Sequence, residues 1–198
     1  MGGGDKGLVE VAGQPMLAHV VARLRPQVDA LVLNANGDPG RFAGFGLPVV
    51  ADTMADFPGP LAGVLAGLRW ALGHAPSATH VVSAPGDAPL LPQDLVAKLE
   101  VAAQARPGAI PVAASEGQMH PVIALWPVSL ADDLEAALRD GLRPVRRHPP
   151  DGAGHARLSF TSKRRAWRMR EQILSSAMSI AVTPWMKEGW RMRTPPRA

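Results

Sequence analysis

The chain of 198 residues contains no cysteine. It therefore has no disulfide framework, no thiolate ligands for a metal and no cysteine nucleophile. No apolar run approaches the roughly 18 residues that a membrane-spanning helix requires, and the start of the chain lacks the pattern of a signal peptide. These absences predict a cytoplasmic protein with no membrane association.

The net charge of +4 hides two regions of opposite charge. Residues 1–142 carry 8 Lys and Arg against 14 Asp and Glu, a net charge of −6, whereas residues 143–198 carry 13 against 3, a net charge of +10. The high isoelectric point thus belongs to the last quarter of the chain, and we do not expect nucleic acid to be the main partner. The composition predicts a domain over 1–142 followed by a basic tail, rich in Arg, Pro and Trp, over 143–198.

Apolar periodicity predicts helices and strands that alternate along residues 1–142. The predicted helices cover residues 16–25, 61–72, 93–105 and 130–138, and the predicted strands cover 30–36, 47–51, 79–84, 108–115 and 120–126. Such alternation is typical of an α/β fold with a mostly parallel sheet that is covered on both faces. The last two strands are joined by a short connection and are expected to form an antiparallel pair.

Polar side chains follow the predicted parallel strands at their carboxyl ends, where such sheets bind ligands. Asn34 and Asn36 end one strand, Asp52 follows the next, and Asp87 stands in a Pro-Gly turn after the strand at 79–84. Mg²⁺ binds one or two carboxylates together with substrate phosphates and water, so Asp87 is the candidate metal ligand. The alternative is that these Asp and Asn residues only form turns or cap a helix.

A glycine run opens the chain and is followed by Lys6. Backbone N–H groups of Gly2, Gly3 and Gly4 could approach a phosphate closely, and the lysine would add a positive charge. The Lys-Ser/Thr pair of a P-loop is absent, and a flexible terminus is the alternative interpretation.

Taken in order, several segments resemble the motifs of the molybdenum cofactor guanylyltransferases, the MobA family. These segments are Gly-Gly-Gly-Asp-Lys-Gly at 2–7, Leu-Asn-Ala-Asn at 33–36, Phe-Pro-Gly-Pro-Leu-Ala-Gly at 57–63, Pro-Gly-Asp-Ala-Pro at 85–89, and His120-Pro121. The resemblance covers about residues 1–142. It implies a Rossmann-like three-layer sandwich of the nucleotidyltransferase type.

The resemblance also implies the reaction, in which GMP passes from GTP to the phosphate of molybdenum-bound molybdopterin with Mg²⁺ as the cofactor. It gives catalytic roles to Lys6, which would bind the triphosphate, and to Asp87, which would hold Mg²⁺ close to the nucleotide. The remaining nucleotide-binding positions would be Gly2, Gly3, Gly4, Asn34 and Asp52, with His120 and Pro121 near the pterin. GTP and molybdenum-bound molybdopterin would be the substrates, and molybdoenzymes or other cofactor-biosynthesis proteins the protein partners.

Two departures from the family pattern concern the ends of the chain. The family begins with a strand that ends in Leu-Ala-Gly-Gly, followed by an Arg, and neither precedes this glycine run. We interpret the sequence as truncated at its N-terminus, which would leave two neighbouring strands with exposed edges. The family's closing Phe-x-Asn-x-Asn-Thr-Pro segment is also absent, so residues 143–198 are interpreted as the product of a reading-frame shift and are expected to be disordered or loosely docked.

Two other functions stay open at the level of sequence. One is a related nucleotidyltransferase that uses CTP or a sugar phosphate, because base choice depends on a few loop contacts. The other is a catalytically impaired nucleotide-binding fragment whose basic tail, with Trp167, Trp185 and Trp190 among its arginines, binds nucleic acid.

Overall fold

The computed structural model describes residues 5–54, 59–140 and 178–183. Its α-helices are α1 (Met16–Leu24), α2 (Pro60–His74), α3 (Leu95–Ala105) and α4 (Ala131–Arg139), and its 3-10 helices are η1 (Lys6–Leu8), η2 (Arg25–Gln27), η3 (Pro39–Phe45) and η4 (Val128–Leu130). Its strands are β1 (Glu10–Val11), β2 (Gln14–Pro15), β3 (Ala30–Asn34), β4 (Val49–Val50), β5 (His80–Pro85), β6 (Val112–Ser115), β7 (Gln118–Pro127) and β8 (Met178–Thr183).

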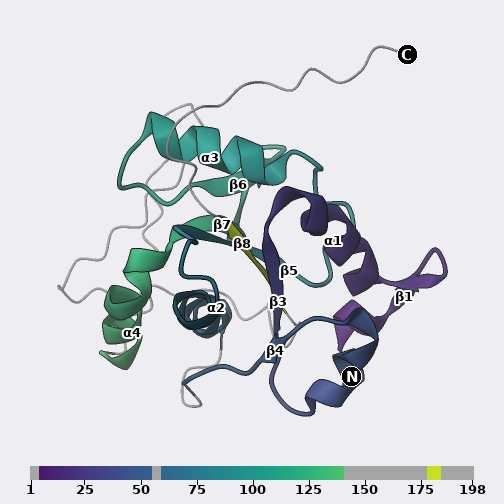
Figure 1. The fold of residues 1–198 in the computed structure, drawn as a ribbon. Coiled ribbons are helices and arrows are strands. Elements are labelled where there is room, and N and C mark those ends of the chain that lie inside the picture. Colours follow the sequence, from purple (N-terminus) through teal and green to yellow (C-terminus); the bar gives the residue numbers. More distant parts are fainter. Residues whose placement is uncertain (1–4, 55–58, 141–177, 184–198) are drawn as a thin grey trace.

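A six-stranded mixed sheet in the order β4-β3-β8-β5-β7-β6 forms the centre of the described fold (Figure 1). β3 and β4 are parallel, and β8 pairs antiparallel with both β3 and β5, so β3 and β5 also run in the same direction. β7 is antiparallel to β5 and to β6, as expected for the predicted pair of strands. The α/β class is confirmed, and the sheet is mixed because β7 and β8 run against the other strands.

Side chains of the central strands point alternately to the two faces of the sheet, as the period of two requires. On one face, Leu31, Leu33 and Val82 belong to a buried cluster with apolar residues of α1 and α3. On the other face, Val32 and Val81 belong to a second cluster with α2 and α4. Figure 1 shows these helix pairs on opposite sides of the sheet. The predicted three-layer sandwich is therefore confirmed.

α1 and α2 show how the sequence determines the position and the buried face of a helix. In α1, Leu17, Val20 and Leu24 are fully buried, at the spacing of one helical face. α2 begins at Pro60, whose fixed φ suits the first turn of a helix. Its Gly63 is buried, as are most residues over its first three turns, so α2 packs closely against its neighbours. Among the described helices, none combines the length and the apolar character needed to span a membrane.

β8 lies within the predicted basic tail, residues 143–198, whose other residues fall outside the description. Its five pairings with β3 and six with β5 place it between the two strands. At Met178–Thr183 the structure therefore differs from the expectation of a loosely docked tail. The physical reason is that β3 and β5 are buried strands, whose N–H and C=O groups require partners along both edges.

Ser83 joins the buried parts of β5 and β7 through its hydroxyl group. The hydroxyl accepts a hydrogen bond of 2.9 Å from the indole Nε1 of Trp126 and donates one of 2.8 Å to the carbonyl of Val122. Both side chains are inaccessible, with exposures of 0% for Ser83 and 1% for Trp126. The hydroxyl therefore satisfies a polar N–H group inside the core.

Replacing Ser83 with alanine is expected to lower the free energy of unfolding by about 1–3 kcal/mol, because the indole N–H would stay buried without a partner. Urea denaturation followed by tryptophan fluorescence measures this change. The matched control is Ser77→Ala at an exposed position, where a change within about 0.5 kcal/mol is expected. Equal stability of the two variants would contradict the role given to the Ser83 hydroxyl.

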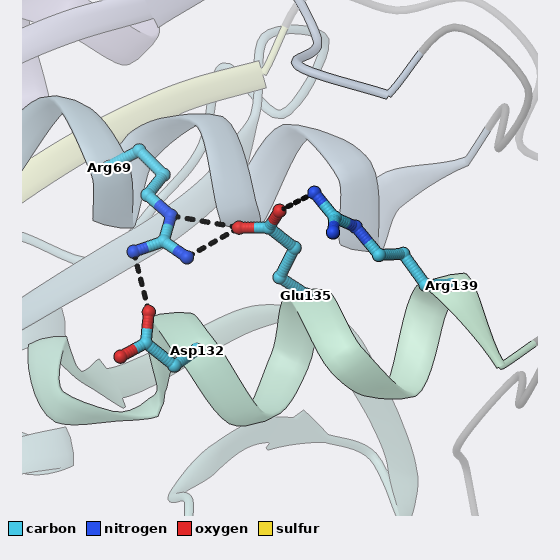
Figure 2. Close-up of polar contacts among 4 residues, drawn as sticks. All are labelled: Arg69, Asp132, Glu135 and Arg139. Atoms are coloured by element: carbon cyan, nitrogen blue, oxygen red, sulfur yellow. Dashed lines mark hydrogen bonds and ion pairs between the residues drawn. The ribbon is translucent and has the colours of Figure 1, made fainter.

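Charged side chains tie α2 to α4 in a cluster of four residues (Figure 2). Arg69 contacts Asp132 at 2.7 Å and forms a two-pronged contact with Glu135, which also pairs with Arg139. The hydrogen bond from Arg69 lowers the pKa of Glu135, so this interaction is present at neutral pH and is lost as the pH falls through the lowered pKa. The cluster adds a polar link between two helices whose apolar residues already share one buried cluster.

Candidate functional site

Three strands deliver polar residues to one edge of the sheet, which we call the carboxyl edge. β3 ends at Asn34, β4 ends two residues before Asp52, and β5 ends two residues before Asp87. These strands run in the same direction, so their ends meet at this edge. Met178 of β8 pairs with both Asn34 and Pro85, which therefore lie about 10 Å apart, twice the spacing of neighbouring strands.

Asp52 is held by two asparagines from the end of β3. Asn34 Nδ2 donates to one carboxylate oxygen of Asp52 at 2.9 Å, and Asn36 Nδ2 donates to the other at 2.7 Å. The backbone N–H of Asp52 in turn donates to Asn36 Oδ1 at 2.8 Å. Asn34 is only 8% exposed, whereas Asn36 is exposed and Asp52 is half-buried. The arrangement fixes an oriented carboxylate at the carboxyl edge while leaving it partly accessible.

The turn that carries Lys6 packs against the turn that carries Asp87. Gly7 is buried between the two, and a Cβ atom at this position would lie 3.3 Å from the carbonyl oxygen of Gly86 and 3.5 Å from Leu17 Cβ. Any larger residue would have to push the backbone of the second turn away. Glycine thus permits η1 to approach the end of β5, and Lys6 is exposed beside it.

The same turn is also linked to the end of β3. Asp5, directly before η1, forms an ion pair of 3.2 Å with Arg41 of η3, and Arg41 donates a hydrogen bond to the carbonyl of Asn36. The η1 turn therefore lies between the ends of β3 and β5. The structure in this way gathers Lys6, Asp52 and Asp87, which are distant in sequence, along one edge.

Asp87 stands in the turn after β5, and the residue is half-buried. No group of three or more His, Asp or Glu side chains within the described ranges could enclose a metal ion. Mg²⁺ does not need such an enclosure, since it is commonly bound through one or two carboxylates together with nucleotide phosphates and water. The donor set at the carboxyl edge therefore fits an Mg²⁺ ion that arrives with a nucleotide.

His120 and Pro121 lie near the start of β7, which begins at the carboxyl edge because β7 is antiparallel to β5. The His120 Nε2 atom is 2.6 Å from the hydroxyl of Ser115 on the neighbouring strand. Gly2, Gly3 and Gly4 lie outside the described residues. The binding role given to each predicted site residue stays a prediction.

Sequence reasoning missed the link between Asp5 and Arg41. Asp5 stands in the glycine-rich segment that the sequence singled out, whereas Arg41 stands in a segment after Asn36 to which no role was assigned from the sequence. No spacing or motif connects them, because their contact exists only once β3 and the η1 turn are packed together. A lone arginine in the short segment after a polar strand end gave no local signal of this contact.

Comparison with known proteins identifies relatives over most of the chain. The family model described as MobA-like NTP transferase domain matches residues 1–153. A molybdenum cofactor guanylyltransferase of Rhodopseudomonas palustris (strain BisB5) is 60% identical over 148 residues, which cover 74% of this chain and 70% of the relative. The protein with the same name from Bradyrhizobium sp. (strain ORS 278) is 53% identical, with the same coverage of both chains.

Two solved structures share the fold at lower sequence identity. Molybdopterin-guanine dinucleotide biosynthesis protein A from Archaeoglobus fulgidus aligns with a TM-score of 0.53 and 22% identity, over 71% of this chain and 68% of the other. A putative protein from Aquifex aeolicus VF5 aligns with a TM-score of 0.52 and 20% identity, over 64% and 63% of the two chains. Both support the α/β architecture.

Proposed function

This chain belongs to the MobA-like NTP transferase family, and we propose that it transfers GMP from GTP to the phosphate of molybdenum-bound molybdopterin, releasing pyrophosphate. The observation that carries this proposal is the convergence at the carboxyl edge. There the turn of Lys6 packs against the turn of Asp87, and the oriented Asp52 carboxylate stands at the neighbouring strand ends. The names of the closely related proteins supply the substrate class.

The reaction joins two anionic phosphates. An oxygen of the pterin phosphate attacks the α-phosphorus of GTP, a new P–O bond forms, and the bond between the α-phosphorus and the bridging oxygen breaks as pyrophosphate leaves. The attacking oxygen is already ionised at neutral pH, so neither a side-chain nucleophile nor a strong base is required. The protein must hold the two anions together and offset the charge that develops on the departing group.

The residues at the carboxyl edge can perform these tasks. Lys6 supplies a mobile positive charge for the triphosphate, and the backbone N–H groups of the preceding glycines would add donors. Asn34 and Asp52 would hold the nucleoside through hydrogen bonds, because the asparagine keeps the carboxylate oriented. His120 and Pro121, at the start of β7, would stand on the side of the acceptor.

Asp87 is the residue that would hold Mg²⁺. When bound, the metal neutralises phosphate charge and fixes the geometry of the triphosphate. Asp87 stands two residues beyond β5, in a turn that packs against Gly7. This packing would hold the carboxylate in one position relative to the end of β5. The turn, rather than a cage of further side chains, would set where the nucleotide's phosphates lie.

The test is turnover by the purified chain supplied with GTP, Mg²⁺ and molybdenum-bound molybdopterin. We expect release of one pyrophosphate for each guanine dinucleotide formed, and loss of both products when EDTA removes Mg²⁺. CTP in place of GTP serves as the control for base choice and should support little turnover. Equal use of CTP would favour the cytidylyl alternative, whereas absence of any nucleotide binding would contradict the proposal.

Several further features belong to the same proposal. The chain is divided into a nucleotidyltransferase domain over 1–142 and a basic region over 143–198, which contributes β8 to the sheet of that domain. The protein acts in the cytoplasm on small substrates and contacts other proteins of cofactor biosynthesis or molybdoenzymes when it delivers its product. Salt-sensitive binding to nucleic acid would instead favour the alternative of a basic binding module.

A further inference from the structure

Arg41 connects two segments of the carboxyl edge that are distant in sequence. Its Nη2 atom lies 3.2 Å from Oδ2 of Asp5, and the same nitrogen donates a hydrogen bond to the carbonyl of Asn36. Asp5 directly precedes Lys6, and the side chain of Asn36 holds Asp52. A single guanidinium group therefore touches both the turn that carries Lys6 and the strand end that orients Asp52.

The surroundings of Arg41 hold its guanidinium in one orientation. The guanidinium carbon lies 4.9 Å from the ring centre of Phe42, whose side chain is fully buried. On another side it passes Gly37, where φ is +84° and a Cβ atom would stand 3.5 Å from Arg41 Nη1. Glycine allows both this left-handed backbone and the close passage of the guanidinium. The planar group is thus fixed before any ligand binds.

The two ends of the ion pair differ in exposure. The Asp5 side chain is 9% exposed, whereas that of Arg41 is 38% exposed. A carboxylate removed from water to this degree favours a fixed cationic partner, so the contact restrains the segment that Asp5 occupies. The two partners that Arg41 joins, Asp5 and the backbone of Asn36, lie outside both hydrophobic clusters. Removing Arg41 would leave a nearly buried Asp5 carboxylate without this cation, which costs stability, and we expect the largest displacement at η1, directly after Asp5.

We infer that Arg41 is a positioning residue for nucleotidyl transfer, an inference that rests on the proposed function. It holds the η1 turn at a set distance from the end of β3, so that Lys6 and Asp52 can engage the two ends of one GTP molecule. Without Arg41 the turn keeps its contact with Gly86 on one side but loses the ion pair of Asp5 with Arg41 on the other. Displacement of a reacting group by about 1 Å costs on the order of a hundredfold in rate.

The first test is Arg41→Met, which retains much of the apolar stem and removes the guanidinium. We expect kcat for pyrophosphate release to fall about 10- to 100-fold, with a smaller rise in the KM for GTP. The melting temperature is expected to fall as well, because the nearly buried Asp5 carboxylate loses a cationic partner. The matched control is Arg25→Met in η2, an exposed arginine before the start of β3, which should retain wild-type turnover.

A second readout does not depend on turnover. The N–H groups of Leu8 and Val9 donate to the carbonyls of Asp5 and Lys6, at 3.0 and 3.1 Å, and these bonds define the η1 turn. Amide hydrogen exchange at Leu8 and Val9 should accelerate in Arg41→Met, while exchange in β5 stays unchanged. A uniform acceleration throughout the domain would indicate a global stability effect and would overturn the inference.

Two further variants separate charge from geometry. Arg41→Lys retains the positive charge but lacks the planar fork, so its turnover should lie between those of the wild type and Arg41→Met. The double variant Asp5→Asn with Arg41→Met should be no slower than the slower single variant, because both changes remove the same link. Additive losses would show that the two residues act separately and would overturn the inference.

The outcomes distinguish this inference from the proposed function. If the wild type is active and Arg41→Met is equally active, the positioning role of Arg41 is wrong and the proposed function stands. A wild type that neither binds GTP nor releases pyrophosphate overturns the proposed function, and with it the catalytic consequence of the positioning. Slow turnover together with local acceleration of exchange at η1 supports both.

Discussion

Replacing Asp87 with asparagine is expected to reduce Mg²⁺-dependent pyrophosphate release about a thousandfold. Unit charges 4 Å apart interact by about 4 kcal/mol at an effective dielectric constant near 20, and each 1.36 kcal/mol corresponds to roughly a factor of ten in rate. Asparagine keeps the shape of the side chain but removes the negative charge that would hold the metal. Because Asp87 stands in a half-exposed turn beyond β5, the fold should be retained.

The measurement is the initial rate of pyrophosphate release across a range of Mg²⁺ concentrations, with circular dichroism to verify the fold. Asp29→Asn is the matched control, since Asp29 is exposed and stands directly before β3, at the edge opposite the candidate site. That variant should behave as the wild type. If Asp87→Asn turns over at the wild-type rate with an unchanged requirement for Mg²⁺, the assignment of the metal ligand is wrong.

Placing proline at position 180 is expected to destabilise the whole domain. Ile180 stands in the middle of β8, opposite Val32 of β3 and Ser83 of β5. Proline cannot donate a backbone hydrogen bond and is excluded from central strands. The substitution should cost at least about 1–3 kcal/mol, because a buried carbonyl on the neighbouring strand loses its donor. The loss would extend beyond β8, because β3 and β5 would retain unpaired polar groups along buried edges.

Urea denaturation measures the loss of stability, and light scattering reports the aggregation expected from exposed strand edges. Ile180→Val is the control, since it retains the backbone N–H and a β-branched side chain. A proline variant that unfolds at the same urea concentration as this control would show that β8 does not pair between β3 and β5.

The local elements of this protein could be predicted because their signals are contained in short stretches of sequence. The spacing of Leu17, Val20 and Leu24 is sufficient to define the face of α1, and the apolar run before Asp87 defines β5. The carboxyl edge followed from the direction of successive strands, so the grouping of Asn34 with Asp52 was also within reach of sequence reasoning.

The features that sequence reasoning missed are contacts between distant segments. β8 carries no local sign that it belongs between β3 and β5, because strand pairing depends on which edges are available after the rest of the sheet has formed. The same is true of Arg41, whose two partners are set by how the first residues pack over β3. Periodicity reports which face of an element is apolar and does not report which element that face will meet.

The place of β8 in the chain has a consequence for how the protein is made. β3 and β5 are both synthesised before residues 86–177, yet the strand that separates them follows this whole stretch. At typical translation rates of about 5–20 residues per second, these two strands emerge from the ribosome on the order of ten seconds before β8 is available. Until then β3 and β5 lack the strand that pairs with both, and such unpaired strand edges favour aggregation. The nascent chain is therefore a candidate for protection by chaperones that bind extended apolar segments.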